Sequence, residues 1–165
     1  NEFSNFARMP RPILKKISIE DVLKRSLDFV KISSKSDINY KNNSKVTFIN
    51  GDEEQLNRVF INLIKNSEES FLEKIEKNPN FKGIIDIEIT DNNDYINCDL
   101  KDNGPGITDA KKAMTPYFTT KKSGSGLGLP IVTKIINEHS GSFAIKNNNK
   151  DNGVTITISL PKTNA

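Results

Sequence analysis

The sequence predicts an α/β domain in which helices pack against one sheet. Residues 52–72 repeat apolar side chains every three or four positions, which is the pattern of an amphipathic helix. Residues 85–89 and 96–102 instead alternate apolar and polar side chains, as strands buried on one face do. A chain of 165 residues is long enough for one ordinary core and short for two. We therefore expect one domain with at most a short appendage.

The composition limits the kinds of partner and compartment. Charged residues make up 27% of the chain but the net charge is only +3, so the basic residues are scattered and nucleic acid is not implied. The single cysteine, Cys98, excludes an internal disulfide and fits a reducing compartment. No apolar run is long enough to cross a membrane. We expect a cytoplasmic piece of a longer protein, and an inner-membrane anchor elsewhere in that protein is compatible with the sequence.

The first residues predict the end of a helix and a linker. Residues 1–8 carry apolar side chains at helical spacing, and Pro10 and Pro12 then stop the helix and favour an extended chain. We therefore divide the sequence into residues 1–12, the helix end and linker, and residues 13–165, the domain.

One helix and two short strands precede the long helix. Ser18 and Asp21 resemble a capping box, and the apolar stripe behind them predicts a helix over residues 19–30. Strand-like segments follow at residues 38–40 and 46–49.

Two predicted hairpins supply most of the sheet. A short polar turn joins the strands at residues 85–89 and 96–102. An Asn-rich turn closed by Gly153 joins those at residues 142–145 and 154–160.

The strongest functional signal lies where the strand over residues 96–102 ends. Asp102 shares the phase of the apolar residues, so we expect its carboxylate to point into the covered face, where it needs hydrogen-bond donors. Gly104 and Gly106 carry no side chains, so a ligand can approach their backbone closely. The stretch suits a flat ligand with an amino group, although a plain turn would also explain it when it is taken alone.

Two asparagines of the long helix form a second candidate. Asn62 and Asn66 lie one turn apart on the border of the apolar arc. Asn is a poor helix former, so the pair needs a reason other than helix propensity, and binding is one such reason. The alternative is a pair of solvated side chains in an Asn-rich sequence.

A third candidate is a glycine-rich turn after a long aperiodic segment. Residues 107–125 are too long for an ordinary connection, and we interpret them as a mobile lid. Residues 124–129 then lead into a helix over residues 130–139, whose free N–H groups would suit phosphates. The turn is not a dinucleotide fingerprint, because no strand precedes it, and it lacks the Gly-Lys-Ser/Thr of a P-loop.

His139, the only histidine, is predicted in the last turn of that helix. A cation there would meet the negative end of the helix dipole. Because no candidate catalytic partner accompanies it, we assign it a structural role.

Four segments occur in the order of four known sequence boxes. They are NLIKNSEES (residues 62–70), DNGPG (102–106), PYFTTK (116–121) and GSGLGL (124–129). They resemble the N, G1, F and G2 boxes of the ATP-binding catalytic domain of sensor histidine kinases, over nearly the whole chain. The opening residues also resemble the end of the dimerisation helix in nitrogen-regulation-type sensor kinases.

The resemblance implies a Bergerat-type, two-layer α/β sandwich with a mixed, mostly antiparallel sheet covered on one face by helices. It implies that ATP binds between helices and lid, that Asn66 ligates Mg²⁺ with support from Asn62, and that Asp102 accepts a hydrogen bond from the adenine amino group. Asn66 and Lys121 would be the catalytic residues. The further nucleotide contacts implied are Gly104, Gly106, Thr120, Lys121, Gly124, Gly126, Leu127, Gly128 and Thr155.

Two positions depart from the family pattern. Glu69 falls where a basic residue often contacts phosphate, so Lys65 or Lys121 would have to supply that charge. The usual Gly-Thr near the last strand is Gly153-Val154-Thr155 here, which leaves the role of Thr155 open.

The resemblance implies a protein-histidine kinase that transfers the γ-phosphoryl group of ATP to a histidine on a separate helical dimerisation domain, absent here. The implied partners are that domain and the receiver domain of a response regulator, with a homodimeric full-length protein and a monomeric fragment. The alternative is an ATP-hydrolysing conformational switch, as in gyrase, mismatch-repair proteins and the ninety-kilodalton chaperone. Those proteins place a Glu general base where this chain has Asn62, whose amide cannot take a proton from water. A third interpretation is a module that binds nucleotide without transferring a phosphoryl group.

Overall fold

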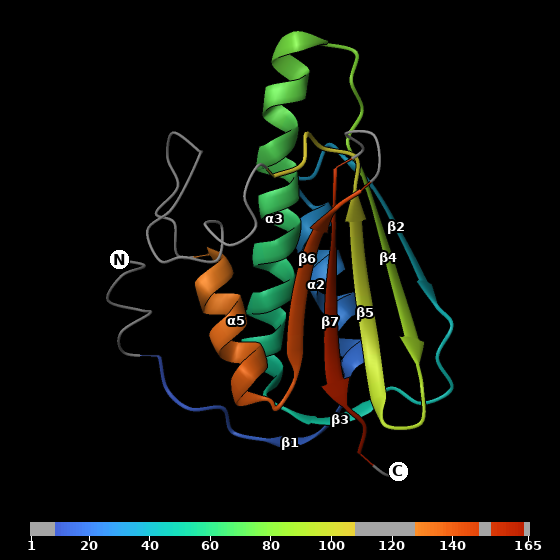
Figure 1. Cartoon of the computed structure of the whole chain (residues 1–165), viewed down its shortest axis with the longest axis vertical. Helices are drawn as coiled ribbons and strands as arrows, with labels where there is room; N and C mark the ends of the chain where they lie inside the picture. Colours follow the sequence, from blue (N-terminus) through green and yellow to red (C-terminus); the bar gives the residue numbers. More distant parts are fainter. Residues whose placement is uncertain (1–8, 108–127, 149–152, 164–165) are drawn as a thin grey trace.

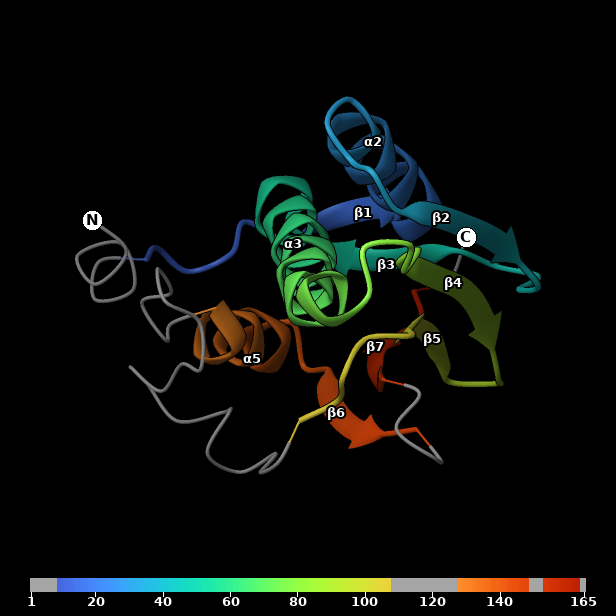
Figure 2. The ribbon, with the colours of Figure 1, turned by 90° about the horizontal axis from the view of Figure 1, so that it is seen from above.

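Three helices lie on one face of a five-stranded sheet in the computed structural model, which describes residues 9–107, 128–148 and 153–163 (Figure 1). The helices are α2 (Ile19–Lys31), α3 (Glu53–Lys77) and α5 (Gly128–Glu138). In spatial order, the strands are β2 (Asp37–Asn42), β4 (Ile84–Asp91), β5 (Tyr95–Asp102), β7 (Val154–Pro161) and β6 (Ser142–Asn147). Seen from above, α3 lies between α2 and α5 (Figure 2). The three helices form one layer, and the sheet forms the second layer beside it. The predicted α/β sandwich is confirmed.

The sheet is mixed, as expected. β2 pairs with β4 in parallel, and the other three pairs are antiparallel. A separate two-stranded sheet joins β1 (Lys15–Ser18) to β3 (Phe48–Gly51). The sequence did not predict β1, because only one of its four side chains is buried and so short a segment shows no alternation.

α2 and α3 begin within one residue of the predicted positions, whereas α5 begins at Gly128, two residues before the predicted Pro130. The Ser18 hydroxyl accepts a hydrogen bond from the Asp21 N–H at 3.3 Å and caps α2. The Asp52 carboxylate caps α3 through the Gln55 N–H at 3.1 Å. However, α3 continues to Lys77, beyond the predicted end at residue 72, because its last turns no longer face the core and the apolar pattern ends before the helix does.

The core lies between the helix layer and the sheet. The alternating residues Ile96, Cys98 and Leu100 of β5 face the helices, and each is buried. Burial raises the pKa of the Cys98 thiol to about 12, which fits a packing role. Within the described ranges, no helix combines the length and apolar character needed to cross a membrane.

Candidate functional site

Asp102 ends β5 with its carboxylate inside the helix-covered face, as its phase predicts. Its residue is only 8% exposed. The Ser67 hydroxyl of α3 donates to Oδ2 at 2.9 Å. The backbone N–H groups of Gly104 and Val154 donate to Oδ1 at 2.9 and 3.2 Å. The carboxylate is therefore held at the end of the sheet by three neutral donors, and each lies on a different segment of the chain.

Two glycines, Gly104 and Gly153, lie so close to Asp102 that a side chain at either position would meet neighbouring atoms. A Cβ on Gly104 would lie 2.7 Å from the Ser70 hydroxyl and 3.2 Å from the Asp102 carboxylate. Gly153 has φ +88°, and a Cβ there would lie 2.2 Å from the Asp102 carbonyl oxygen and 2.4 Å from Oδ1. The sequence predicted close approach at Gly104, but it marked Gly153 only as the end of a turn.

The beginning of the predicted lid is held by Asn147 at the end of β6. The Asn147 side chain accepts from the Ile107 N–H at 2.8 Å and donates to the Ile107 carbonyl at 2.6 Å. A Cβ on Gly106 would lie 2.8 Å from the same side chain. Gly106 thus packs directly against the Asn147 side chain.

Asn66 on α3 faces the N-terminus of α5. A Cβ on Gly128, the first residue of α5, would lie 3.2 Å from the Asn66 amide nitrogen. Asn62 lies one turn earlier and is also half-buried, in agreement with the predicted border of the apolar arc. Ser67, the residue after Asn66, contacts Asp102, and Asn66 itself lies beside Gly128. The segments 62–70 and 102–106 and the start of α5, where the segment 124–129 ends, therefore meet at one end of the sheet.

Lys65, one of the two lysines expected to supply charge to a phosphate, lies on the α2 side of α3. The Lys65 ammonium lies 5.7 Å from the centre of the Phe29 ring on α2. α2 and α5 lie on opposite sides of α3, so Lys65 faces away from the Gly128 side of the helix (Figure 2). Lys121, the other lysine expected to supply charge to a phosphate, lies outside the described residues.

The structure places the side chain of Thr155, a residue whose role the sequence left open. In the register between β5 and β7, Thr155 pairs with Lys101, whereas its neighbours Val154 and Ile156 are buried. Its side chain therefore lies on the face away from the helices, where its hydroxyl donates to the Asn148 side chain. The position next to Asp102 on β7 belongs to Val154.

Several of the residues predicted to bind the nucleotide lie outside the described ranges. Most of the predicted lid, residues 107–125, lies outside the described ranges. So do Thr120, Lys121, Gly124, Gly126 and Leu127.

His139 has the structural role predicted for it, but not as a cation. Its residue is 4% exposed, and its Nε2 accepts a hydrogen bond from the Asp52 N–H at 3.0 Å. Nδ1 lies 2.8 Å from the Ile135 carbonyl oxygen, to which it donates. A doubly protonated ring has no acceptor, so the hydrogen bonds select the neutral imidazole.

Asp52 in turn holds the segment that enters the domain. Its carboxylate accepts from the Ile13 N–H at 2.9 Å as well as from Gln55. Burial raises the pKa of this carboxyl group, but the backbone N–H donors outweigh burial and hold the pKa below its usual range. The Gln55 side chain adds a hydrogen bond to the Pro10 carbonyl oxygen at 2.9 Å.

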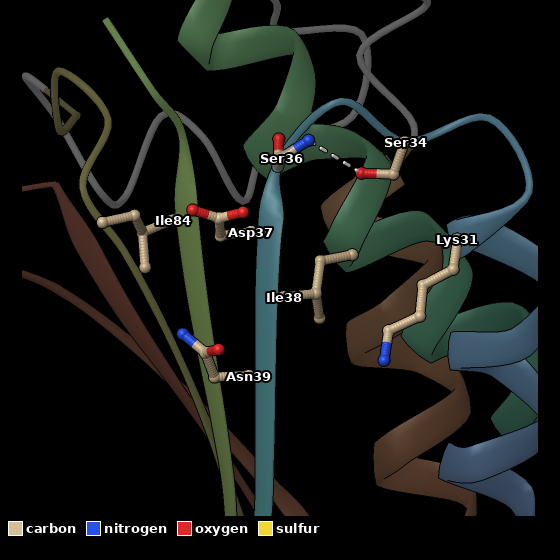
Figure 3. A pocket seen from close by; sticks show the side chains of 7 residues that line it. All are labelled: Lys31, Ser34, Ser36, Asp37, Ile38, Asn39 and Ile84. Carbon is tan, nitrogen blue, oxygen red and sulfur yellow. Dashed lines mark hydrogen bonds between the residues drawn. The ribbon is translucent and has the colours of Figure 1, made fainter.

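A separate pocket opens at the β2 edge of the sheet. It has a volume of about 310 Å³ and is lined by Lys31, Ser34, Ser36, Asp37, Ile38, Asn39 and Ile84 (Figure 3). The Ser34 hydroxyl donates to Glu68 at 2.7 Å and accepts from the Ser36 N–H at 3.1 Å, so these polar groups satisfy one another. β4 lies between β2 and β5 and so separates this pocket from Asp102. None of the predicted site residues lines the pocket.

The chemistry of the Asp102 site suits a ligand that is a hydrogen-bond donor at one end and an anion at the other. Asp102 offers an anionic acceptor, and the N-terminus of α5 offers the positive end of a helix dipole. No group of three or more His, Cys, Asp or Glu in the described part of the chain could hold a metal. The Asn66 amide oxygen beside Gly128 fits a hard cation that takes its remaining ligands from substrate and water.

Comparison with known proteins identifies the family. A family model described as histidine kinase-, DNA gyrase B- and HSP90-like ATPase matches residues 51–164. Sporulation kinase B of Bacillus subtilis is 36% identical over 143 residues, which cover 80% of this chain and 32% of that protein. A protein of Rickettsia typhi described as NtrY-like is 35% identical over 162 residues, 96% of this chain and 26% of that protein. The chain thus spans about a third or less of the length of these relatives.

Solved structures share the fold. The catalytic domain of histidine kinase ThkA superposes with a TM-score of 0.74 at 24% identity, covering 92% of this chain and 99% of that domain. Full-length ShkA in complex with AMPPNP superposes with a TM-score of 0.81 at 19% identity, covering 100% of this chain and 35% of ShkA. Since the family model matches more than half of the residues, the chain belongs to the family of histidine kinase-, DNA gyrase B- and HSP90-like ATPases.

Proposed function

We propose that this chain is the ATP-binding catalytic domain of a sensor histidine kinase. The observation that carries the proposal is the buried Asp102 carboxylate, placed at the same end of the sheet as Asn66 and the start of α5. Adenine presents an amino donor to such an acceptor, whereas guanine presents a carbonyl oxygen at the same position and would be rejected. Gly104 and Gly106 would bring backbone close to the base beside Asp102.

The phosphates would lie toward α5. The N-terminus of α5 at Gly128 would stabilise their charge, and the Asn66 oxygen would hold Mg²⁺ with Asn62 in support. Bound Mg²⁺ neutralises charge on the phosphates during transfer. We further propose contacts from Lys121 and Thr120 and from the turn that contains Gly124, Gly126 and Leu127, with Lys121 closing on the γ-phosphate.

Two features favour transfer to another domain over hydrolysis. Position 62 is an asparagine, so the general base of the hydrolysing relatives is missing there. His139 is buried and uses both ring nitrogens, so it is not available as an acceptor. The phosphoryl group would therefore go to a histidine on a separate dimerisation domain of a homodimeric, cytoplasmic or membrane-anchored kinase, with residues 1–12 as the connection.

A response regulator is the partner we propose downstream. A structure of histidine kinase ThkA in complex with the response regulator protein TrrA superposes on this chain with a TM-score of 0.77 at 24% identity, covering 98% of this chain and 46% of that one.

The nucleotide assignment is tested by calorimetry with ATP and Mg²⁺ on Asp102→Asn. Loss of a charge-assisted hydrogen bond costs about 1.5–3 kcal/mol, so ATP affinity should fall at least about tenfold with the fold intact. Asp99→Asn is the matched control: Asp99 lies on the same strand, but it accepts from Thr157 at 2.8 Å on the other face of the sheet. Unchanged ATP affinity in Asp102→Asn would remove Asp102 from the base site.

The kinase assignment is tested with labelled ATP. The chain alone should bind ATP and hardly consume it, because phosphoryl transfer depends on a positioned nucleophile. Label should appear on a histidine-bearing dimerisation domain when one is added. If the chain alone hydrolyses ATP at the rate of a dedicated ATPase, and Glu68→Gln or Glu69→Gln abolishes hydrolysis, the conformational-switch function replaces the kinase.

A further inference from the structure

Ser67 donates a hydrogen bond to the Asp102 carboxylate from the helix layer. It follows Asn66 on α3, is 8% exposed and donates its single hydroxyl hydrogen to Oδ2 at 2.9 Å. An ionised carboxylate can only accept hydrogen bonds, so the direction of this bond is fixed. Neither the four sequence boxes nor the helical pattern singled out Ser67.

The two oxygens of Asp102 have unequal surroundings. Oδ1 accepts from two backbone N–H groups, those of Gly104 and Val154. Among the described residues, only the Ser67 hydroxyl donates to Oδ2. A carboxylate offers about four acceptor positions, so the three bonds leave one, and it lies on Oδ2.

The bond from Ser67 also fixes the plane of the carboxylate. The group rotates about its Cβ–Cγ bond, and the two donors on Oδ1 restrain this rotation at one oxygen only. The third donor, on the opposite oxygen, stops this rotation and sets the direction of the remaining lone pair.

We propose that Ser67 is a positioning residue for base recognition, which aims the free lone pair of Asp102 Oδ2 at the exocyclic amino group of adenine. This inference rests on the proposed function, because it requires Asp102 to be the acceptor for that group. Ser67 itself would touch the carboxylate and not the base. Its effect should therefore depend on whether the base carries the amino group.

The test compares ATP with purine riboside triphosphate, which lacks the 6-amino group, by calorimetry with Mg²⁺. Ser67→Ala should lower ATP affinity by roughly three- to tenfold, because misdirection weakens the bond to the amino group. Affinity for the purine analogue should stay within about twofold, since that ligand makes no such bond. Ser67→Thr, which keeps the hydroxyl, should restore the preference for ATP.

Ser26→Ala is the control for loss of a buried serine. Ser26 is fully buried on α2, and its hydroxyl lies 2.9 Å from the Val22 carbonyl oxygen and 2.6 Å from Asn57 Oδ1. Its replacement should leave the ratio of the two affinities as in the native chain. If Ser67→Ala does not fold, Ser67→Cys keeps the volume with a weak donor and carries the same expectation.

The outcomes separate this inference from the proposed function. If Asp102→Asn abolishes the preference for ATP but Ser67→Ala keeps the native ratio, or lowers both affinities equally, the positioning role is wrong and the nucleotide assignment stands. If Asp102→Asn itself keeps the native preference, the assignment of the base site fails, and the role of Ser67 fails with it.

Discussion

At the scale of single residues, Gly153 is the position where the site tolerates least change. Its φ of +88° costs other residues about 1–3 kcal/mol, and a Cβ would lie 2.2 Å from the Asp102 carbonyl oxygen. Gly153→Ala should therefore destabilise the domain by about 2–4 kcal/mol in urea unfolding. It should also weaken ATP binding, because the Asp102 backbone has to move.

Gly51→Ala provides the control for this prediction. Gly51 is also buried, but its Cβ would meet only the terminal methyl groups of Leu56, Ile17 and Ile49, at 2.8 to 3.1 Å. Those side chains can adjust, so the loss should stay below about 1.5 kcal/mol and ATP affinity should not change. Equal losses in the two variants would contradict the special role of Gly153.

The residues of the site differ in how far the sequence predicts them. Asp102 is predictable because its phase in β5 places a charge among buried positions. A buried charge is costly unless it is paired or hydrogen-bonded, so its presence indicates a binding site. Ser67 is not predictable, because a serine on a helix face is ordinary and its partner lies 35 residues away. The place of Thr155 was not predictable either, since strand register decides which face a side chain occupies and periodicity alone does not place β7 against β5.

At the scale of elements, α3 begins at a polar junction that should respond to pH. The pKa of Asp52 is lowered in the folded state, so the ionised carboxylate stabilises the fold above its usual pKa of 3.8, and this contribution is lost as pH falls through the lowered value. Asp52→Asn should cost about 0.5–1 kcal/mol at pH 7, because it removes the charge at the helix N-terminus. The difference from the native chain should shrink as the pH falls below about 4.

Urea unfolding of both proteins from pH 7 to pH 3 measures this effect. Asp28→Asn, an exposed carboxylate on α2, is the control and should leave the acid dependence as it is. If Asp52→Asn and the native chain differ by the same amount at every pH, the ionised carboxylate of Asp52 does not contribute as inferred.

The elements themselves are mostly predictable, and their exceptions have physical reasons. The strands β4, β5 and β7 have six or more residues with clear alternation, and the sequence predicts each of them. β1 escapes prediction because its stability comes from pairing with β3, which is distant in sequence. The end of α3 is missed because Glu73 and Lys77, an i, i+4 pair 3.7 Å apart, belong to a solvated part of the helix without apolar periodicity.

At the scale of the whole molecule, Lys162 joins the two sheets. Its backbone forms a bridge with Ile49 of β3, and its ammonium lies 2.7 Å from the Asp91 carboxylate, with side chains that are 18% and 11% exposed. Lys162→Ala should raise amide hydrogen exchange in β3 by roughly three- to tenfold, because the ion pair with Asp91 is lost. The central strand β5 should keep its protection.

Lys134→Ala is the matched control. Lys134 forms an ion pair of 2.9 Å with Glu138 within α5, so its loss should leave exchange in β3 unchanged. Uniform exchange changes throughout both variants would show that Lys162 acts on global stability and not on the junction between the sheets.

The antiparallel pairing of β5 with β7 has a consequence for how the domain folds. Asp102 and Val154 are 52 residues apart, whereas β4–β5 and β6–β7 are both pairs of neighbouring strands joined by short connections. Local hairpins form sooner than long loops close, so we expect the β4–β5 and β6–β7 pairs to form first. The pairing of β5 with β7 then joins these two hairpins, and we call it the seam. One of the three donors to Asp102, the Val154 N–H, lies across that seam, so the proposed base site is complete only after the two hairpins have joined. ATP would therefore bind only the completely folded domain and stabilise it by mass action. The appearance of ATP binding during refolding would show when β5 has paired with β7.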